Sequence, residues 1–544
     1  MPDVNELLRD FADLKDFRVN FDSQWTEVAE RVWPERALFT TTERAEGDKR
    51  TEFMFDSTAM LALPKYAAAV DSLITPRTQR WHQLTVPDEA LAANLNVKQY
   101  LEQVNGILWR ARYSPKANFA GQQSEVYMSV GAFGNGVMFV DDVLGVGIRY
   151  KSCHLGEIYF AENYYGQVDK CYRYFKMSAR QIVQRYGDKA STKAKQAYQQ
   201  QPERKLYVIH CVKPNEDYSG VGKSFRNMRF SSYHICEESK EVMNEGGYRT
   251  FPYIIYRAAT APGETYGRGP AMTVLPGIKM SNEMKKTIIR AGHLMTRPPL
   301  LLPADGALSP FSLRPDALNY GSLDRQGNEL VKPLNIQARL DYGGELLEQE
   351  REDIKDAFLV NLFQILVDHP QMTATEAMLR AQEKGQLTGP TVGRFQSEGL
   401  GPELERELDI LSAAGQLPPM PDELIEAGGE VTIEYTAPIN RLQRAEDGVA
   451  ILRTLEQLAP LAQLDPTVMD IFDPEATGRE LAEINGVPAK VLRSKEQMAQ
   501  LEEEKQAAVE AQALLAAAPI ISSSVKDLAS ANQAARQGGS VIPA

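Results

Sequence analysis

The spacing of apolar residues predicts helices over most of the first 115 positions. One periodic apolar segment follows Asp22–Ser23 and ends at Pro34, and a second, TAMLALPKYAAAVDSLI, follows Asp56–Ser57. Aspartate and serine commonly cap helix N-termini, so each of these pairs is expected to mark the start of a helix. The next segment, TPRTQRWHQLTV, predicts a turn that leads into a strand.

Between residues 120 and 260 the pattern changes to short β-rich runs bounded by glycine, asparagine and proline. The segment AENYYGQVDKCYRYF predicts a hairpin around Tyr165–Gly166. SARQIVQRYGD predicts a short amphipathic helix, with Ser178 as its N-terminal cap and Gly187 as its stop. The expected strands lie in the segments VMFVDD, GIRYKSC, EIYFAEN, QVDKCYRYFKM, KLYVIHCVKP and YIIYRAA.

Two longer helices follow, separated by an insert. The first is predicted from about Pro276 to Arg297 and the second from about Asp341 to Phe363. The insert, residues 298–340, is rich in proline and glycine and contains short apolar stretches but no long element. The insert therefore lacks an element that could bury a core of its own.

The helical pattern returns over residues 374–417, with a break near Gly385 to Pro390 and an end at Gly415. GGEVTIEYTAP then predicts a strand, and residues 440–544 are predicted to form a string of helices with a disordered end after about Ser530. Helix caps in this last region are expected at Asp465–Pro466, Asp473–Pro474 and Ser494.

A short break separates two strong helices in the stretch VDHPQMTATEAMLRAQEKG, residues 367–385. An apolar helix runs up to Leu366, His369–Pro370 interrupts it, and Thr373 can cap a new helix with Glu376 reaching back to it. From the spacing alone, an ordinary turn and an exposed functional loop explain this break equally well.

The two helices that flank the insert carry opposite charges along one side. On the first, the basic residues lie within about 60° of one another around the helix axis. The basic stripe consists of Lys279, Lys286, Arg290, His293 and Arg297. The acidic stripe on the second helix consists of Asp341, Glu345, Glu348, Glu352 and Asp356.

The sequence allows three interpretations of these stripes. Both can be solvated faces, which is the most common reason for a charged stripe on a helix. The stripes can instead pair between neighbouring helices, within one chain or between copies of the chain. Alternatively, the basic stripe faces phosphate groups. Pairing between copies would suit a ring, because a head-to-tail interface repeats the same contact until the rotation closes.

The composition limits the possible classes of function. A chain of 544 residues is too long for one core, so three or four structural regions are expected. The formal net charge of −13 argues against nucleic-acid binding through overall charge but allows a local basic stripe. The sequence contains no apolar run long enough for a membrane span, and its four separated cysteines are expected to be reduced thiols.

No recognised catalytic motif occurs in the chain. G-x-x-x-x-G-K-[ST], G-x-S-x-G and H-E-x-x-H are all absent, and the G-x-G at Gly267–Gly269 lacks its third glycine. His154 and Glu157 could form an acid–base pair, but a turn between strands explains them as well, and Asp141–Asp142 is a pair common in hairpins. The sequence therefore predicts no enzyme, no catalytic residue, no metal site and no cofactor.

The order of elements and several segments resemble the head-to-tail connector, or portal protein, of short-tailed tailed bacteriophages (podoviruses). The resemblance covers nearly the whole chain, and its departures are ANF in place of SNF and an alanine-rich C-terminal region. It depends on WTEVAERVWPERALF, KRTEFMFDSTAMLAL, DSLITPRTQRWHQL, ANFAG, GEIYFAENYYGQVDKCYRYFKMSARQIVQRYG, YGRGPAMTVLPGIKMSNEMKK, RPPLLLP, MTATEAMLRAQEKG and LTGPTVGRFQSEGL.

The resemblance implies the portal fold of the α+β class, assembled as a ring. Mapped by element order, its parts are a mixed α/β wing (1–268 and 374–440), a first stem helix (269–297), a clip (298–340), a second stem helix (341–365), a tunnel loop (366–373), a helical crown (441–530) and a disordered tail (531–544). The tunnel loop would project at the DNA through Val367, Asp368, His369, Pro370, Gln371 and Met372.

The resemblance also implies a function and a set of partners. Twelve copies would form a ring at one capsid vertex of the virion, assembled in the host cytoplasm, through which double-stranded DNA is packaged and ejected. The clip would dock the terminase packaging motor and later the tail adaptor. Major capsid, scaffolding and internal core proteins would be further partners, and no membrane would be involved.

An adaptor or scaffold-binding protein of the capsid that never touches DNA is the alternative. In that alternative, the basic stripe should be fully paired or lie outside a channel.

Overall fold

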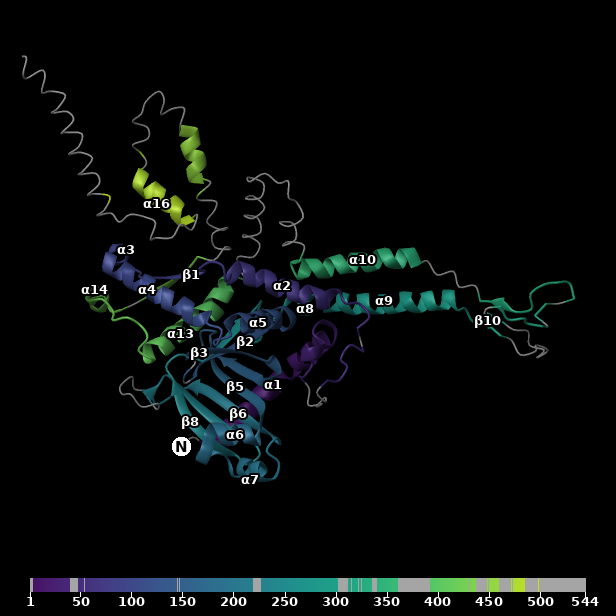
Figure 1. Cartoon of the computed structure of the whole chain (residues 1–544), viewed down its shortest axis with the longest axis horizontal. Coiled ribbons are helices and arrows are strands. Elements are labelled where there is room, and N and C mark those ends of the chain that lie inside the picture. The colour runs from purple at the N-terminus through teal and green to yellow at the C-terminus, as the bar shows by residue number, and fades with distance from the viewer. Residues whose placement is uncertain are drawn as a thin grey trace, which may run out of the picture. The chain divides into compact units, whose positions relative to one another are not determined.

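The computed structural model describes residues 3–39, 47–218, 227–301, 312–334, 340–360 and 392–436, except for a few single positions, and short parts of 448–498. The chain divides into two compact units, Met1–Gln443 and Arg444–Ala544. The strands described all belong to the first unit (Figure 1). The described part of the second unit includes α16 (Pro474–Ile484).

The N-terminal cap predicted for α16 is confirmed, because the carboxylate of Asp473 accepts a hydrogen bond from the backbone N–H of Ala476 at 3.1 Å. The caps predicted at Asp465 and Ser494 and the tail at 531–544 lie outside the described residues.

The first helix, α1 (Val4–Val32), is longer than predicted. It begins after Asp3, which caps it, so the predicted start at Asp22–Ser23 is wrong. Asp22 does not cap a helix because it is held by the buried Arg18 one turn earlier, at 2.9 Å. Arg18 also donates to the backbone carbonyl of Leu155 at 2.8 Å, so its position depends on a distant part of the chain. The helix ends before Pro34, as predicted.

Among the remaining helices of the body, α2 (Thr58–Ile74) follows Asp56–Ser57 as predicted, whereas α5 (Phe119–Phe133) occupies the start of the span 120–260 that was predicted to be β-rich, so that prediction is wrong there. We define the body as the first unit without α9, α10 and the insert between them. Its further helices are α2 (Thr58–Ile74), α3 (Glu89–Ala93), α4 (Leu95–Arg112), α5 (Phe119–Phe133), α6 (Ala179–Tyr186), α7 (Thr192–Gln200), α8 (Pro270–Thr273), α13 (Gly401–Ala413) and α14 (Asp422–Glu426), with η5 (Phe395–Leu400) directly before α13.

The strands form three antiparallel sheets in the body. A five-stranded sheet has the order β4-β5-β6-β7-β8, a three-stranded sheet has the order β3-β2-β9, and β1 pairs with β12. Their bounds are β1 (His82–Thr85), β2 (Asn135–Val143), β3 (Gly147–Cys153), β4 (Ile158–Glu162), β5 (Val168–Ser178), β6 (Lys205–Pro214), β7 (Phe230–Cys236), β8 (Glu241–Tyr248), β9 (Tyr253–Arg257) and β12 (Thr432–Tyr435).

Helices cover both faces of the five-stranded sheet (Figure 1). Alternate side chains of a strand point to opposite faces. On β6, Ile209 and Cys211 pack in the cluster that contains Phe11 of α1, whereas Leu206 and Val208 pack with α6 and α7. The sheet therefore has one apolar layer on each side. The mixed α and β class predicted from the sequence is confirmed.

Local sequence signals located several elements correctly. The hairpin around Tyr165–Gly166 joins β4 to β5, and Ser178 forms a capping box with Gln181 at the start of α6. Gly187 follows the end of α6, and the predicted strand in GGEVTIEYTAP is β12. The four cysteines are free and buried, in agreement with reduced thiols.

A buried ionic cluster connects the end of α4 to α13, β1 and β3. Arg112 donates through Nε to Glu407 Oε1 at 2.9 Å and pairs with the other carboxylate oxygen through Nη2. Tyr150 donates to the same carboxylate, and His82 lies 3.2 Å from Arg112. Because Arg112 and Glu407 are both fully buried, each depends on the other for compensation of its charge.

A second carboxylate, Glu403, lies one turn before Glu407 and is also fully buried. Tyr256 of β9 donates to its Oε2. Burial, and then the charge of Glu407, raise the pKa of Glu403 to about 8. Arg112 is hydrogen-bonded to Glu407, and the raised pKa of Glu403 favours the protonated form of its carboxyl group.

Replacing Glu403 with glutamine should make the stability of the body less dependent on pH. A carboxyl group whose pKa is raised on folding stabilises the protein while it is protonated, and this contribution is lost as the pH rises toward the folded pKa, about 8. The melting temperature of Glu403→Gln minus that of the wild type should therefore increase from pH 5 to pH 8 and level off above about pH 9. The corresponding difference in the free energy of unfolding should change by at most about 1.4 kcal/mol per pH unit.

Glu405→Gln is the matched control, because Glu405 lies on the same helix but is exposed. A Glu403→Gln difference that stays constant over this range, like that of the control, would show that Glu403 is ionised in the folded protein.

Candidate functional site

Two long helices leave the body side by side and form what we call the helix pair. It consists of α9 (Leu275–Thr296) and α10 (Leu340–Ala357), with the insert beyond their far end (Figure 1). The helices are antiparallel, because Gly277 lies beside Glu350 near the body while Ile288 lies 3.6 Å from the Cβ position of Gly343 further out. The predicted helix from about Pro276 to Arg297 is confirmed within one residue at each end.

The second helix of the pair is shorter than predicted. It ends at Ala357, whereas the sequence predicted a helix to about Phe363. The chain turns at Leu359, whose φ is +57°, in the left-handed region. Phe358 is fully buried, with its ring 6.4 Å from that of Tyr66. Burying Phe358 and Val360 in the body explains why the helix stops before its apolar pattern ends.

One buried carboxylate joins the helix pair to the body. Asp56, directly before α2, is 6% exposed and accepts from Arg351 of α10 at 3.1 Å and 3.3 Å. On the α9 side, Asn282 Oδ1 accepts from the backbone N–H groups of Phe55 and Asp56, both at 2.9 Å. We call these contacts the Asp56 joint.

The Asp56 joint favours the ionised carboxylate. Burial alone would raise the pKa of Asp56, but hydrogen bonds from Arg351 and Thr58 outweigh burial and lower it below its ordinary value. The sequence predicted Asp56 only as the residue that opens a helix. Its role in the joint could not be predicted, because Arg351 is 295 positions away in the chain.

The basic stripe divides into two halves. Near the body, Lys279 pairs with Glu27 of α1, and Lys286 binds Glu283 at 3.0 Å and lies 5.5 Å from the ring of Phe55. Further out, three residues are exposed: Arg290, His293 and Arg297. The structure therefore leaves the outer half of the stripe available for a phosphate or for another chain.

The acidic stripe lies along α10 and is partly neutralised by that helix. Glu348 binds Arg351 at 3.1 Å and lies 3.8 Å from Lys355, which also binds Glu352 at 2.5 Å. Glu345 and Asp356 are exposed, and the side chain of Asp341 lies outside the described residues. The ion pairs of Glu348 and Lys355 lie within α10, so this part of the acidic stripe is neutralised on its own helix.

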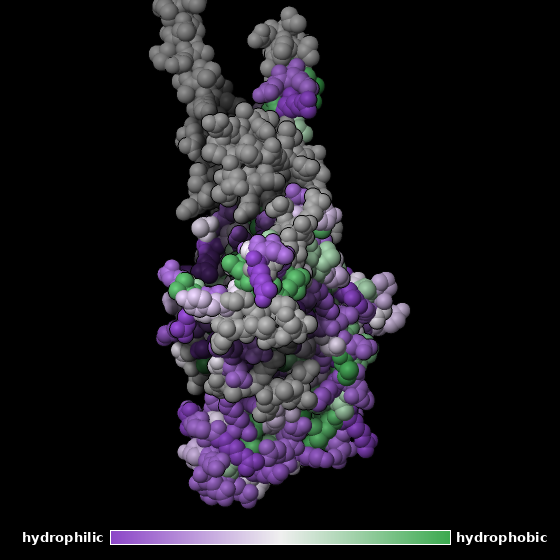
Figure 2. All heavy atoms as spheres, turned by 90° about the vertical axis from the view of Figure 1, so that its right-hand side faces the viewer, coloured by the Kyte–Doolittle hydropathy of each residue, from purple (hydrophilic) through white to green (hydrophobic). Residues whose placement is uncertain are grey.

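Large apolar side chains are uncovered on the helix pair and the insert. The insert begins and ends in a two-residue sheet of β10 (Leu300–Leu301) and β11 (Lys332–Pro333). Figure 2 shows apolar residues beside hydrophilic ones on the side that the insert faces. The uncovered side chains are Met280, Ile289, Leu294, Met295, Leu301, Leu313, Leu318, Tyr320, Leu323, Leu330, Leu334, Tyr342 and Leu346. Extended apolar surface of this kind marks a site of contact with other proteins.

The sequence candidates for chemistry turn out to be structural. His154 is buried, accepts from the backbone N–H of Gly156 at 2.8 Å and lies 2.8 Å from the carbonyl oxygen of Arg36. Burial lowers its pKa to about 4. Glu157 binds Arg173 at 3.0 Å rather than His154. Gly267 and Gly269 lie against the backbone of Gly134, so these two glycines allow close contact between chain segments.

No described helix is long and apolar enough to cross a membrane. Among the same residues, no group of three or more histidine, cysteine, aspartate or glutamate side chains is arranged to hold a metal ion. The tunnel-loop residues Val367 to Met372 lie outside the described residues.

Comparison with known proteins identifies the family. The family described as "Bacteriophage head to tail connecting protein" matches residues 4–492 of this chain. The chain belongs to this family. A "Probable portal protein" of Bordetella phage BPP-1 is 27% identical over 505 residues, covering 92% of this chain and 90% of the relative. The "Portal protein" of Salmonella phage epsilon15 is 27% identical over 511 residues, with the same two coverages.

Among solved structures, the neck of a native gene transfer agent particle is 12% identical, with a TM-score of 0.35, and the match covers 73% of this chain and 85% of that one. As a head-to-tail connector, the chain is a structural component of the virion at the junction of head and tail.

In the connector, weakening the Asp56 joint should destabilise the attachment of the helix pair. Asp56→Asn keeps the shape of the side chain but removes the charge that Arg351 binds. Charge-assisted hydrogen bonds contribute about 1.5–3 kcal/mol, so we expect a loss of about 1–2 kcal/mol in the free energy of unfolding. A double-mutant cycle with Arg351→Met should give a coupling of about 1 kcal/mol at pH 7.

Because the pKa of Asp56 is lowered, this coupling should be present above its ordinary pKa of 3.8 and be lost as the pH falls through the lowered value. Asp353→Asn on α10 is the control, since Asp353 is exposed. Zero coupling at pH 7 would mean that the contact does not hold the helix pair.

Proposed function

We propose that this connector forms a ring of twelve copies through which double-stranded DNA enters and leaves the capsid. In this proposal the body forms the wing, the helix pair forms the stem, and the insert at residues 298–340 forms the clip. The outer half of the basic stripe then faces the DNA. The single observation that carries the proposal is the exposure of Arg290, His293 and Arg297 on a chain of this family, while the inner lysines are paired.

The charge distribution suits a channel along which DNA slides. Contacts to phosphate are independent of sequence and together produce strong attraction that depends on salt. The chain as a whole carries a formal charge of −13, so attraction to DNA would be limited to a few basic positions. Twelve copies of one arginine would form a ring of positive charge that guides the duplex without holding it at one place.

The uncovered apolar residues support assembly through the helix pair and the insert. Leu318 and Tyr320 of the insert are 80% and 78% exposed, and Met295 at the end of α9 is 48% exposed. Contact with neighbouring copies would bury such side chains at about 25 cal/mol per Å² of apolar surface.

The proposed partners of the ring are the major capsid and scaffolding proteins, internal core proteins, the terminase motor and later the tail adaptor, the last two at the clip. Residues 366–373 would form a loop directed at the DNA. We propose no enzymatic step.

Reversing the charge at the outer end of α9 tests the DNA contact. Arg290→Glu with Arg297→Glu should leave ring yield unchanged, because both side chains are exposed, but should reduce packaged DNA per particle several-fold. The measurement is DNA content of purified particles beside ring yield.

The control for that charge reversal is Lys98→Glu with Lys189→Glu, which makes the same charge change at exposed positions of the body. If the α9 variant packages DNA as well as this control does, the DNA contact is wrong and the adaptor without DNA contact is favoured.

Replacing residues 303–332 with a short glycine and serine linker tests the clip. The body and the Asp56 joint do not involve these residues, so the body should keep its melting temperature while particles fail to attach tails. A replacement of the same kind at 219–226, between β6 and β7, is the control and should retain tails. Tails that attach normally to the first variant would contradict the assignment of the insert as the clip.

A further inference from the structure

Two neighbouring tyrosines are exposed to solvent at the turn between β4 and β5. Tyr164 is 97% exposed and Tyr165 is 85% exposed, the two most exposed large apolar side chains described. Their rings lie 5.5 Å apart in an edge-to-face arrangement. A tyrosine buries about 150–250 Å² when it is covered, so this pair offers a large gain in apolar contact to a partner.

The turn that carries these tyrosines is held in one conformation. Asn163 Oδ1 accepts from the backbone N–H groups of Tyr165 at 2.9 Å and Gln167 at 3.0 Å. Gly166 has a φ of +77°, which favours glycine at this position. Arg257, which is 4% exposed, donates to the carbonyl of Gly166 at 2.9 Å. A turn that is already ordered before binding loses less conformational entropy when it binds. This turn is therefore suited to inserting into a cavity of a partner.

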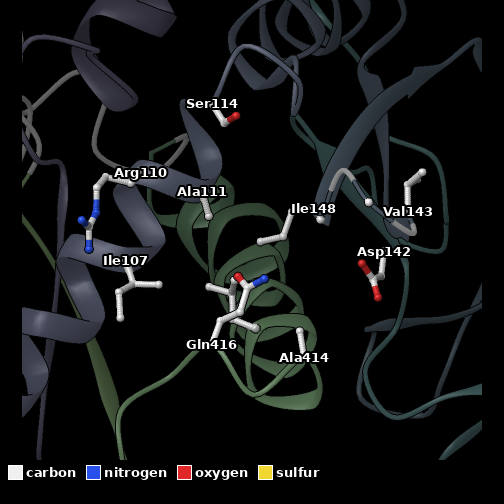
Figure 3. Close-up of a pocket in the computed structure, with 12 residues that line it drawn as sticks. Ile107, Arg110, Ala111, Ser114, Asp142, Val143, Ile148, Ala414 and Gln416 are labelled. Carbon is white, nitrogen blue, oxygen red and sulfur yellow. The ribbon is translucent and has the colours of Figure 1, made fainter.

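A cavity of about 750 Å³ lies at a different part of the body (Figure 3). Its walls come from α4, from the turn between β2 and β3, and from the end of α13. Ile107, Ile148 and Leu411 are apolar lining residues, whereas Arg110, Asp142 and Gln416 supply hydrogen-bonding groups. This combination matches tyrosine, which has an apolar ring and a hydroxyl group that needs a polar partner when it is buried.

The tyrosine turn is held near the start of β2, and the cavity lies at the end of β2. Arg257, which holds the turn, pairs in register with Asn135 at the start of β2, and the cavity is lined by Val143 at the other end of that strand. At about 3.4 Å per residue, these two ends of β2 are about 27 Å apart. Two separate and different surfaces of one subunit can form a head-to-tail contact, which is the kind of contact that a closed ring repeats.

We propose that Tyr164 and Tyr165 of one subunit insert into this cavity of the next subunit around the ring. The inference depends on the proposed ring and names one contact that closes it. Two tyrosines would bury about 300–500 Å², which is below the roughly 1,200 Å² of a stable interface, so they act as an anchor within a larger contact. The cavity's polar groups would accept or donate hydrogen bonds to the tyrosine hydroxyl groups.

Disulfide trapping tests the contact. The double variant Tyr165→Cys with Gln416→Cys is assembled into rings, oxidised and separated under denaturing conditions without reductant. We expect a ladder of covalent oligomers that reaches the full ring. The turn is held near one end of β2 and the cavity lies at its other end, so the two cysteines of one chain are not expected to join. The four native cysteines are buried, so a ladder reports contacts between subunits. Tyr198→Cys with Gln416→Cys is the control, because Tyr198 is exposed on α7 and should give no ladder.

Substitution of both tyrosines provides the second measurement. Tyr164→Ser with Tyr165→Ser should keep the melting temperature of the monomer and raise the concentration needed for half-assembly about tenfold or more. If wild-type rings form, but no ladder appears and the serine variant assembles like the wild type, the proposed tyrosine insertion is wrong and the proposed ring is not contradicted. If the serine variant assembles normally but fails to join another virion protein, the turn binds that protein and the inference is also overturned. If the wild type forms no rings, the proposed function itself fails.

Discussion

The position of the helix pair depends on one buried carboxylate. Asp56 accepts hydrogen bonds from Arg351 of α10, and its own backbone N–H donates to Asn282 of α9, so one residue contacts both helices. Because the carboxylate is buried, Arg351 compensates its charge. The Lys279–Glu27 ion pair and the buried Phe358 add further contacts to the body, and together these contacts fix where α9 and α10 leave it.

The body supports this joint through its own buried polar groups. Arg112, Glu403 and Glu407 connect α4 and α13, while β1 and β12 bring residues 82–85 next to residues 432–435. Parts of the chain on either side of the helix pair and its insert are thus joined in one core. The helix pair and its insert therefore emerge from a body that both flanking parts of the chain build together.

Elements with local signals were predictable from sequence. The capping box of Ser178 and Gln181 and the hairpin at Tyr165–Gly166 depend on residues a few positions apart, and the α9 boundaries follow from local apolar spacing. Contacts between distant residues explain the errors. Arg18 holds Asp22 inside α1 because it also binds Leu155, and burial of Phe358 ends α10 early. The charge stripes were visible in the sequence, but the separation into a paired and an exposed half depends on Glu27 and Phe55, which are distant in the chain.

We propose that the outer end of α9 lines a DNA channel in a closed ring. Cryo-electron microscopy of the purified full-length chain tests it most directly, because it shows both the assembly and the position of this helix. We expect closed rings with an open central channel into which the side chains of Arg290 and Arg297 point. Monomers, or rings in which these side chains lie on the outer surface or are buried between subunits, would contradict it.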